Sequence, residues 1–274
     1  IMILLIGSTG YIGSEFKNQL ASIGYDFKTA SYSTVQLSDL EDIDFVINAS
    51  GYVGKPNVDK AEEEKDKCIM GNVIIPMKIM GYCKDMSIPY GHVSSGCIYT
   101  GSNNFNEYDE PNFSFKYNNC SFYSGTKAVA EDIVRNCPKS YIWRIRIPFD
   151  EDSNPRNYIT KLITYSKLVN SQNSLSHRKE CVNACIRTYM EKCPFGIYNV
   201  VNTNPTTTQE VVELIKTHNL SSKEFDWFDE EEFYKTAAKT PRSNCVLDNR
   251  KLLRLGIQMR DVKTALTDSI IRYE

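Results

Sequence analysis

The chain has 274 residues, a formal net charge of -2, 41% hydrophobic residues and 24% charged residues. These values are ordinary for a globular protein with a sizeable core, and they give no general attraction to nucleic acid or to an anionic membrane. No apolar run approaches the roughly 18 residues that a membrane span needs, and the opening run 1–7 is too short for a signal peptide. We therefore expect a cytoplasmic protein without nucleic-acid or membrane partners.

A glycine-rich turn opens the chain. The apolar run 2–6 predicts a buried strand, and the apolar spacing across 11–24 predicts a helix. Between them, Gly7 allows a tight turn, Gly10 lets a diphosphate approach the backbone, and Gly13 lets the helix pack close to the strand. The free N–H groups at the start of the helix would hold the phosphates. The pattern predicts a dinucleotide site, although a plain glycine turn between a strand and a helix would have the same sequence pattern.

Strands and helices then alternate. Strands are predicted at 25–31, 45–51, 88–95 and 140–148, and helices at 57–72, 72–86 and 120–136. This rhythm predicts a Rossmann-type α/β fold with a doubly wound parallel sheet. The dinucleotide contacts are expected from Gly7, Thr9, Gly10, Tyr11, Ile12, Gly13, Ser31, Ala49, Ser50, Gly51, Tyr123 and Lys127.

The end of the second strand bears on the cofactor. Binders of NAD usually carry a carboxylate there for the ribose 2′-hydroxyl, and the run ending at Ser31 has none. A carboxylate would repel a 2′-phosphate, so its absence favours NADPH, with NADH left open.

A tyrosine, a lysine and a serine form the predicted catalytic group. Tyr123 and Lys127 are four residues apart, so they share one face of the predicted helix. The ammonium should lower the pKa of the phenol, which can then exchange a proton with a carbonyl oxygen. Ser95, at the end of a strand, can donate a second hydrogen bond. The spacing Y-x-x-x-K alone is a common accident, but the preceding glycine motif favours the functional interpretation.

These motifs together resemble the extended short-chain dehydrogenase/reductases. The resemblance rests on "GSTGYIG", "NASG", "SSGCIY" and the pair Tyr123 and Lys127. It implies a Rossmann fold, NAD(P) and a nucleotide-sugar substrate. The stretches "GKPNVD", "SSGCIY", "NPRNYITKLITYSKLVN" and "PRSN" resemble more narrowly the bifunctional 3,5-epimerase/4-reductases that convert UDP-4-keto-6-deoxyglucose to UDP-L-rhamnose.

Epimerisation needs an acid and a base beside the C4 ketone. Cys97 lies two residues beyond Ser95, so an extended chain would point both side chains into one cleft. The related GDP-fucose synthase has a cysteine at this matching position. For the partner, the resemblance implies Lys161 in "NYITK". The alternatives are a buried structural thiol and a solvated lysine, and the residues do not decide which of the two acts as base.

Substrate contacts are inferred more loosely. A diphosphate favours a guanidinium, which makes Arg242 in "PRSN" the first candidate. Lys55 could meet cofactor phosphate or sugar. The complete expected set is Lys55, Ser95, Asn157, Lys167, Asn170, Arg242 and Asn244.

Two lobes are expected. Residues 1–150, completed by about 182–202, would form the NAD(P)-binding domain, and 151–181 with 203–274 the substrate lobe. In the latter we predict helices over 158–169 and 206–219, the second with threonine caps at its start, and a solvated helix face with buried rings over 225–235. The resemblance implies a homodimer formed through two helices, one of them carrying Tyr123.

Nine cysteines are scattered along the chain, without a CxxC pair. Cys181 and Cys185 have helical spacing, but no histidine pair completes a zinc site. We expect reduced, mostly buried thiols and no metal. Three other functions remain open: a dTDP-4-ketorhamnose-type reductase without epimerase activity, a 4,6-dehydratase, and a non-catalytic regulatory subunit of the same fold. The dehydratase is disfavoured because no acidic pair follows Ser95.

Overall fold

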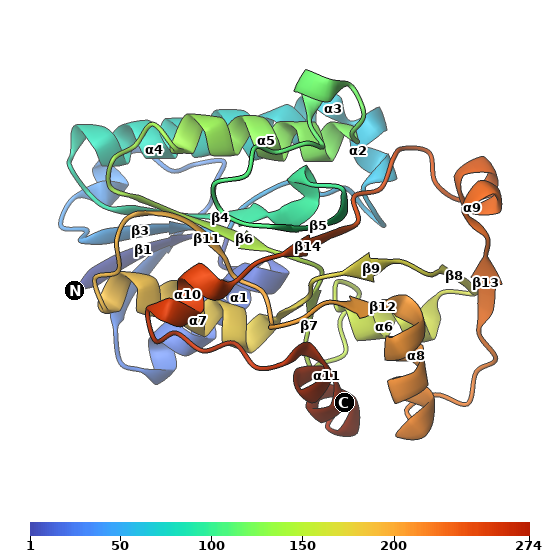
Figure 1. Ribbon diagram of the computed structural model, residues 1–274. Helices are drawn as coiled ribbons and strands as arrows, with labels where there is room; N and C mark the ends of the chain where they lie inside the picture. Colours follow the sequence, from blue (N-terminus) through green and yellow to red (C-terminus); the bar gives the residue numbers. More distant parts are fainter.

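A parallel sheet of six strands forms the centre of the protein. The computed structural model describes residues 1–274, and its strands run in the order β11-β6-β4-β3-β1-β2 (Figure 1). Every neighbouring pair is parallel, which confirms the predicted doubly wound sheet. The strands are β1 (Met2–Ile6), β2 (Asp26–Ala30), β3 (Phe45–Asn48), β4 (Tyr90–Ser95), β6 (Ser140–Ile145) and β11 (Gly196–Asn199).

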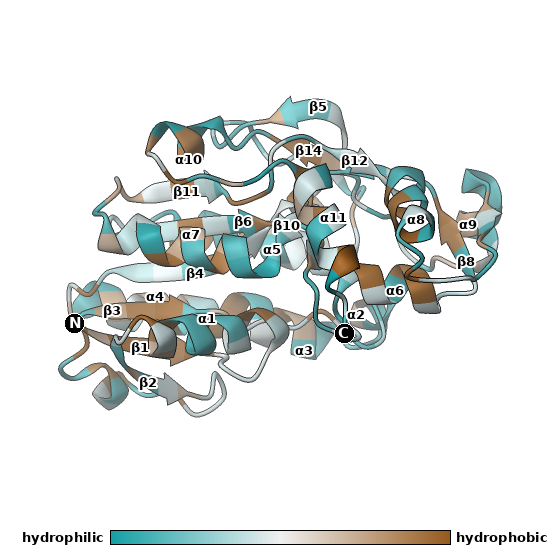
Figure 2. Cartoon of the chain, turned by 90° about the horizontal axis from the view of Figure 1, so that it is seen from below, coloured by the Kyte–Doolittle hydropathy of each residue, from teal (hydrophilic) through white to brown (hydrophobic).

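Helices cover both faces of the sheet. On one face lie α4 (Ile75–Asp85) and α5 (Phe122–Val134), and on the other lie α1 (Tyr11–Ser22) and α7 (Arg178–Met190), side by side (Figures 1 and 2). The apolar face of α7 is buried in the core against the sheet rather than left for a partner. Before α4 the chain forms α2 (Asp59–Glu63), α3 (Lys65–Ile69) and a π-helical turn over Met70–Ile74.

A smaller body lies beyond one end of the sheet, to the right in Figure 1. Its helices are α6 (Tyr158–Thr164), α8 (Thr208–Thr217), α9 (Glu230–Thr236) and α11 (Val262–Ile271). It also has two short strand pairs: β8 (Lys167–Val169) pairs with β13 (Asp226–Phe228), and β9 (Gln172–Asn173) pairs with β12 (Thr206–Thr207). These elements enclose a hydrophobic cluster of their own, which includes Ile159, Val211 and Leu266.

The structure differs from the predicted lobe in three places. The helix predicted over 158–169 ends at Thr164, because 167–169 pair with β13. Of the rings over 225–235 only Phe225 is buried, and no residue of α9 is buried. Residues 245–259 belong to the larger body: β14 (Cys245–Leu247) pairs with β5 (Gly101–Phe105), and α10 (Arg250–Arg254) with the following residues packs on the core around α7.

Short links join the two bodies. β7 (Pro148–Phe149) continues from β6 and pairs with β10 (Ser176–His177), just before α7. The start of α8 has the predicted threonine cap, since Thr207 and Glu210 form a capping box.

All nine cysteines are free thiols, and only Cys120 is not fully buried, as the sequence predicts. None of the helices is both long enough and apolar enough for a membrane crossing. No group of three histidine, cysteine or acidic side chains is placed to hold a metal ion.

A buried ion pair connects α5 to β6. The Arg144 Nε lies 3.1 Å from both carboxylate oxygens of Glu131, and the Ser94 hydroxyl donates to the same carboxylate at 3.0 Å. Replacing Glu131 by glutamine is expected to lower the free energy of unfolding by about 3 kcal/mol, because the Arg144 charge stays buried without its partner. Urea denaturation measures the loss. The exposed Glu63, changed to glutamine, should leave the midpoint unchanged, and equal midpoints for both variants would refute the argument.

Candidate active site

The glycine turn has the close packing that the sequence predicts. Gly7 has φ +84°, and a Cβ built on Gly13 would lie 1.9 Å from the Gly7 carbonyl oxygen. Strand β1 and helix α1 therefore approach as only glycine permits. Gly10 is the N-cap of α1, and no side chain caps the helix. The N–H groups of the first turn are thus available for a phosphate, which fits a dinucleotide.

A cavity of about 480 Å³ lies over this turn. The predicted contacts that line it from the turn and from the end of β3 are Gly10, Tyr11, Ile12, Ala49, Ser50 and Gly51. The predicted catalytic side chains of Ser95, Cys97, Tyr123, Lys127 and Lys161 line the same cavity. The structure therefore brings into one place predicted site residues that are up to 151 positions apart in the chain, counting Gly10 to Lys161. Thr9 and Ser31 are exposed and line neither this cavity nor its neighbour.

Ser95 and Cys97 lie on a tight turn. The expected extended conformation is wrong, because Gly96–Ile98 form a 3-10 turn. The Ser95 hydroxyl accepts the N–H of Cys97 at 3.1 Å and so caps this turn. Both side chains nevertheless line the cavity, and Cys97 is 7% exposed.

Tyr123 and Lys127 lie on α5, as predicted, but their electrostatics differ from expectation. Burial raises the pKa of Tyr123, nearby thiols raise it further, and the Ser95 side chain and the Arg146 charge lower it by less. The Lys127 Nζ donates to the Val93 carbonyl at 3.0 Å, and burial lowers its pKa. The predicted net lowering of the Tyr123 pKa is therefore wrong, since burial of the phenol raises this pKa by more than the neighbouring groups lower it.

The cavity is strongly cationic. Lys127, Arg146, Arg156, Lys161 and Arg242 line it, and no acidic side chain does. Of these, only Arg242 forms an ion pair, with Asp59 at 2.7 Å. The arrangement favours a ligand with several negative charges. Arg146 and Arg156 were not among the predicted residues. Arg156 lies in the quoted motif "NPRN", and an arginine directly after a buried strand was the signal for Arg146.

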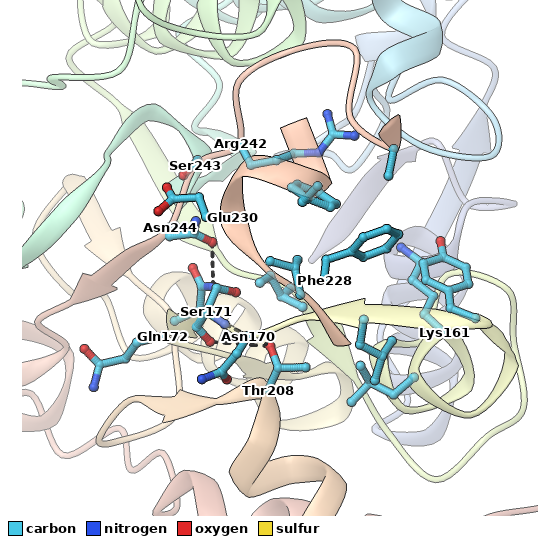
Figure 3. Close-up of a pocket in the computed structure, with 18 of the residues that line it drawn as sticks. Lys161, Asn170, Ser171, Gln172, Thr208, Phe228, Glu230, Arg242, Ser243 and Asn244 are labelled. Atoms are coloured by element: carbon cyan, nitrogen blue, oxygen red, sulfur yellow. Dashed lines mark hydrogen bonds between the residues drawn. The ribbon is translucent and has the colours of Figure 1, made fainter. Parts of the chain in front are cut away.

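Figure 3 shows a second cavity, of about 760 Å³. It adjoins the first cavity and shares Ile147, Lys161, Arg242 and Ser243 with it. The predicted substrate residues Lys167, Asn170, Arg242 and Asn244 line this second cavity. Its far wall carries the rings of Phe228, Phe233 and Tyr234. Lys167 is held by Glu232 and Asn170 by Gln209, so the wall is already ordered by its own contacts.

Lys161 lies at the junction of the two cavities. Burial lowers its pKa, and the positive charge of Arg156 lowers it further. Arg156 is itself fixed by a 3.1 Å hydrogen bond from its Nη2 to the Gly54 carbonyl. A lysine of lowered pKa can exchange a proton near neutral pH.

Two predicted substrate residues lie elsewhere. Lys55 is exposed and lines neither cavity. Asn157 is fully buried as the N-cap of α6, and its amide donates to the carbonyls of Asp150 at 2.8 Å and Asp152 at 2.9 Å. All its polar atoms serve the fold, so the structure does not support a substrate contact there.

The whole sequence matches one family. The profile of the RmlD substrate binding domain covers residues 1–274. The chain belongs to the RmlD family. Among curated RmlD relatives, the bifunctional dTDP-4-dehydrorhamnose 3,5-epimerase/dTDP-4-dehydrorhamnose reductase of Arabidopsis thaliana is 31% identical over 96% of this chain and 90% of its own length.

A trifunctional UDP-glucose 4,6-dehydratase/UDP-4-keto-6-deoxy-D-glucose 3,5-epimerase/UDP-4-keto-L-rhamnose-reductase of Arabidopsis thaliana is also 31% identical, over 98% of this chain. The chain spans 41% of the length of that relative. Among solved structures, a UDP-rhamnose synthase from Acanthamoeba polyphaga mimivirus has a TM-score of 0.90 at 24% identity, with 99% of each chain covered. A dTDP-4-dehydrorhamnose reductase from Clostridium acetobutylicum has a TM-score of 0.82 at 18% identity, with 98% of each chain covered. These structures share the RmlD fold described above.

Proposed function

We propose that this chain is a nucleotide-sugar 3,5-epimerase and 4-ketoreductase that converts UDP-4-keto-6-deoxy-D-glucose to UDP-L-rhamnose with NADPH. One observation carries the proposal: a thiol and a lysine, Cys97 and Lys161, line the same cavity as the carbonyl-binding pair Ser95 and Tyr123. Reduction alone needs no such thiol. The names of the Arabidopsis relatives support the same pair of activities.

The smaller cavity is the proposed NADPH site. The N–H groups at the start of α1 would hold the diphosphate, and Lys127 the hydroxyls of the nicotinamide ribose. Strand β2 ends without a carboxylate, which supports NADPH over NADH. NADPH supplies the hydride, and the protein supplies position and protons.

Ser95 and Tyr123 would act on the C4 ketone oxygen in both reactions. During epimerisation they donate hydrogen bonds to the enolate oxygen. During reduction Tyr123 also transfers its phenolic proton to that oxygen as hydride reaches C4.

Cys97 and Lys161 are the proposed acid and base. The ketone acidifies the hydrogens on C3 and C5, and each inversion removes a proton on one face and returns one on the other. Cys97 belongs to the turn after β4 and Lys161 to α6, so the two groups reach the cavity from different bodies of the protein. That separation supports access to opposite faces of one sugar ring.

The larger cavity is the proposed site for the UDP group, with residues 151–177, 203–244 and 260–274 as the substrate lobe. Arg242 would meet the diphosphate in exchange for part of its contact with Asp59. Asn244, Lys167 and Asn170 offer polar groups to the nucleoside.

Incubation in deuterated water tests the proposal. The protein, UDP-4-keto-6-deoxyglucose and NADPH should yield a product with the mobility of UDP-L-rhamnose and deuterium at C3 and C5, beyond a reaction without enzyme. A reductase alone would leave both carbons unlabelled, and a regulatory subunit would consume no NADPH. One Arabidopsis relative is named for dTDP sugars, so the reaction is repeated with the dTDP form of the substrate. The ratio of the two rates gives the nucleotide preference.

The pH dependence of deuterium exchange reports on Lys161. We expect one inflection that disappears in Lys161→Met and lies below the usual lysine pKa of about 10.4. Rates that rise through this inflection identify Lys161 as base, and rates that fall identify it as acid. Arg156→Gln removes a positive neighbour and should move the inflection to higher pH, whereas Arg156→Lys should keep it in place. An inflection unmoved by Arg156→Gln would contradict the proposed coupling.

We further propose a homodimer formed through α4 and α5. Met70, Ile74 and Met77 have exposed fractions of 51%, 38% and 42% and follow helical spacing along the outer surface beside α5. Met77→Glu is expected to convert a dimer to a monomer in light scattering, while Met86→Glu, at the C-cap of α4 and outside this helical row, should have a smaller effect. A monomeric native protein would refute this.

A further inference from the structure

A buried arginine without an acidic partner lies beside the Gly96–Ile98 turn, which follows Ser95 and contains Cys97. Arg146 directly follows β6 and is 6% exposed. Its Nε and Nη2 donate to the Asn173 side-chain oxygen at 3.2 and 2.6 Å, and Nη2 also donates to the Ser243 carbonyl. The two acceptors of these three hydrogen bonds are neutral.

The other buried arginines are different. Arg144 is paired with Glu131, and Arg178 with Asp150 at 2.8 Å. A buried charge without a counter-ion is costly. Arg146 is also the one buried arginine of the three whose side chain lines the 480 Å³ cavity. A cation kept unpaired at a cavity wall has its electrostatic attraction available for an anion in that cavity.

The side chain of Arg146 passes close to the carbonyl-binding pair. A Cβ built on Gly96 would lie 3.4 Å from the Arg146 Cδ, and Gly96 stands between Ser95 and Cys97. The Arg146 charge lowers the pKa of Tyr123, against the larger effect of burial. Burial raises the pKa of Cys245, and the Arg146 charge lowers it by less; the Cys245 thiol donates to the Gly96 carbonyl at 3.2 Å.

We propose that Arg146 is a positioning residue whose fixed positive charge stabilises the two anions that form at the Ser95–Tyr123 pair. These anions are the C4 enolate oxygen during epimerisation and the Tyr123 phenolate left after reduction. Lys127 is turned to the Val93 carbonyl in this structure, which leaves the cation on the Gly96 side to Arg146. The inference rests on the proposed function for its substrate, but not for its effect on Tyr123.

Steady-state kinetics of Arg146 variants distinguish an electrostatic role of Arg146 from a purely structural one. Arg146→Gln keeps hydrogen-bond donors and loses the charge, whereas Arg146→Lys keeps the charge and loses the planar fork. We expect kcat for reduction to fall about 30-fold in the glutamine variant, with KM for the sugar within threefold, and about fivefold in the lysine variant. Arg146→Met, neutral and of similar length, should match the glutamine variant. Equal losses in the lysine and glutamine variants, or a loss confined to KM, would overturn the proposal in favour of a brace through Asn173 and Ser243.

A second readout needs no turnover. A fluorinated tyrosine, acidic enough to ionise below the pH of unfolding, replaces Tyr123, and its ionisation is followed by ¹⁹F NMR. We expect the pKa of the phenol to rise by about one unit in Arg146→Gln and Arg146→Met and to stay near the native value in Arg146→Lys. The exposed Arg250, changed to glutamine, is the control and should cause no shift. An unchanged phenol pKa in both neutral variants would refute the role of Arg146. A shifted pKa in a protein that fails to reduce UDP-4-keto-6-deoxyglucose would refute the proposed substrate and leave the role of Arg146 standing.

Discussion

Replacing Tyr123 by phenylalanine is expected to lower kcat for ketone reduction by about 10³-fold. The hydroxyl is the proposed proton donor to the C4 oxygen, and the cavity lining offers no second phenol beside Ser95 and Lys127 other than Tyr11, which is bound to Asp150 at 2.9 Å. Because phenylalanine keeps the partly buried ring, NADPH affinity should stay within a few fold of native. Stopped-flow absorbance of NADPH and fluorescence titration measure the two quantities.

The control for this variant is Tyr189→Phe on α7. That phenol donates to the Asp44 carbonyl on the other side of the sheet, far from the cavity lining. The Tyr189→Phe variant should retain the native kcat for ketone reduction. A Tyr123→Phe protein with more than a tenth of native activity would mean that another group delivers the proton, with Ser95 as the next group to change.

Replacing Cys97 by alanine should separate the two activities. We expect deuterium incorporation at C3 and C5 to fall by about 10²-fold or more, since one of the two groups that move protons is gone. Reduction of the already inverted ketone, UDP-4-keto-L-rhamnose, should fall less than tenfold because Ser95 and Tyr123 remain. Mass spectrometry of the product and NADPH consumption on the inverted substrate give the two rates.

Cys120→Ala serves as the matched control for the thiol. Cys120 is half-buried just before α5 and lines neither cavity. Both rates should remain native in this variant. If Cys97→Ala lost reduction and exchange equally, the thiol would be needed for the shape of the Ser95 turn, and the assignment of Cys97 as acid or base would fail.

The sequence predicted those features that depend on neighbours along the chain. The glycine turn, the parallel strands and the shared face of Tyr123 and Lys127 follow from apolar periodicity and from local backbone rules. The threonine cap of α8 is equally local. Cys97 came from its spacing to Ser95 together with family resemblance, and Lys161 from the resemblance alone; the structure places both at the cavity.

Other features depend on residues far apart in the chain. Asn157 has the residue type of a substrate ligand, yet its amide is fully used by Asp150 and Asp152. The pKa of Tyr123 follows burial, which no spacing reveals. The pairing of β14 with β5 joins segments about 140 residues apart, so the sequence assigned 245–259 to the other lobe. In the sequence Arg146 is one of several charged residues near a strand. Only the structure shows that it is buried and has no acidic partner.

The edge position of β11 has a consequence for biosynthesis. β6 emerges from the ribosome with its outer backbone groups unpaired, and the strand that covers them follows only after a further stretch of chain, residues 146–195. During that interval the nascent sheet has an open margin of the kind that recruits other extended chains. Fragments that stop before residue 196 should therefore aggregate when expressed, more than fragments that include residue 199, in which β11 pairs with the outer backbone groups of β6.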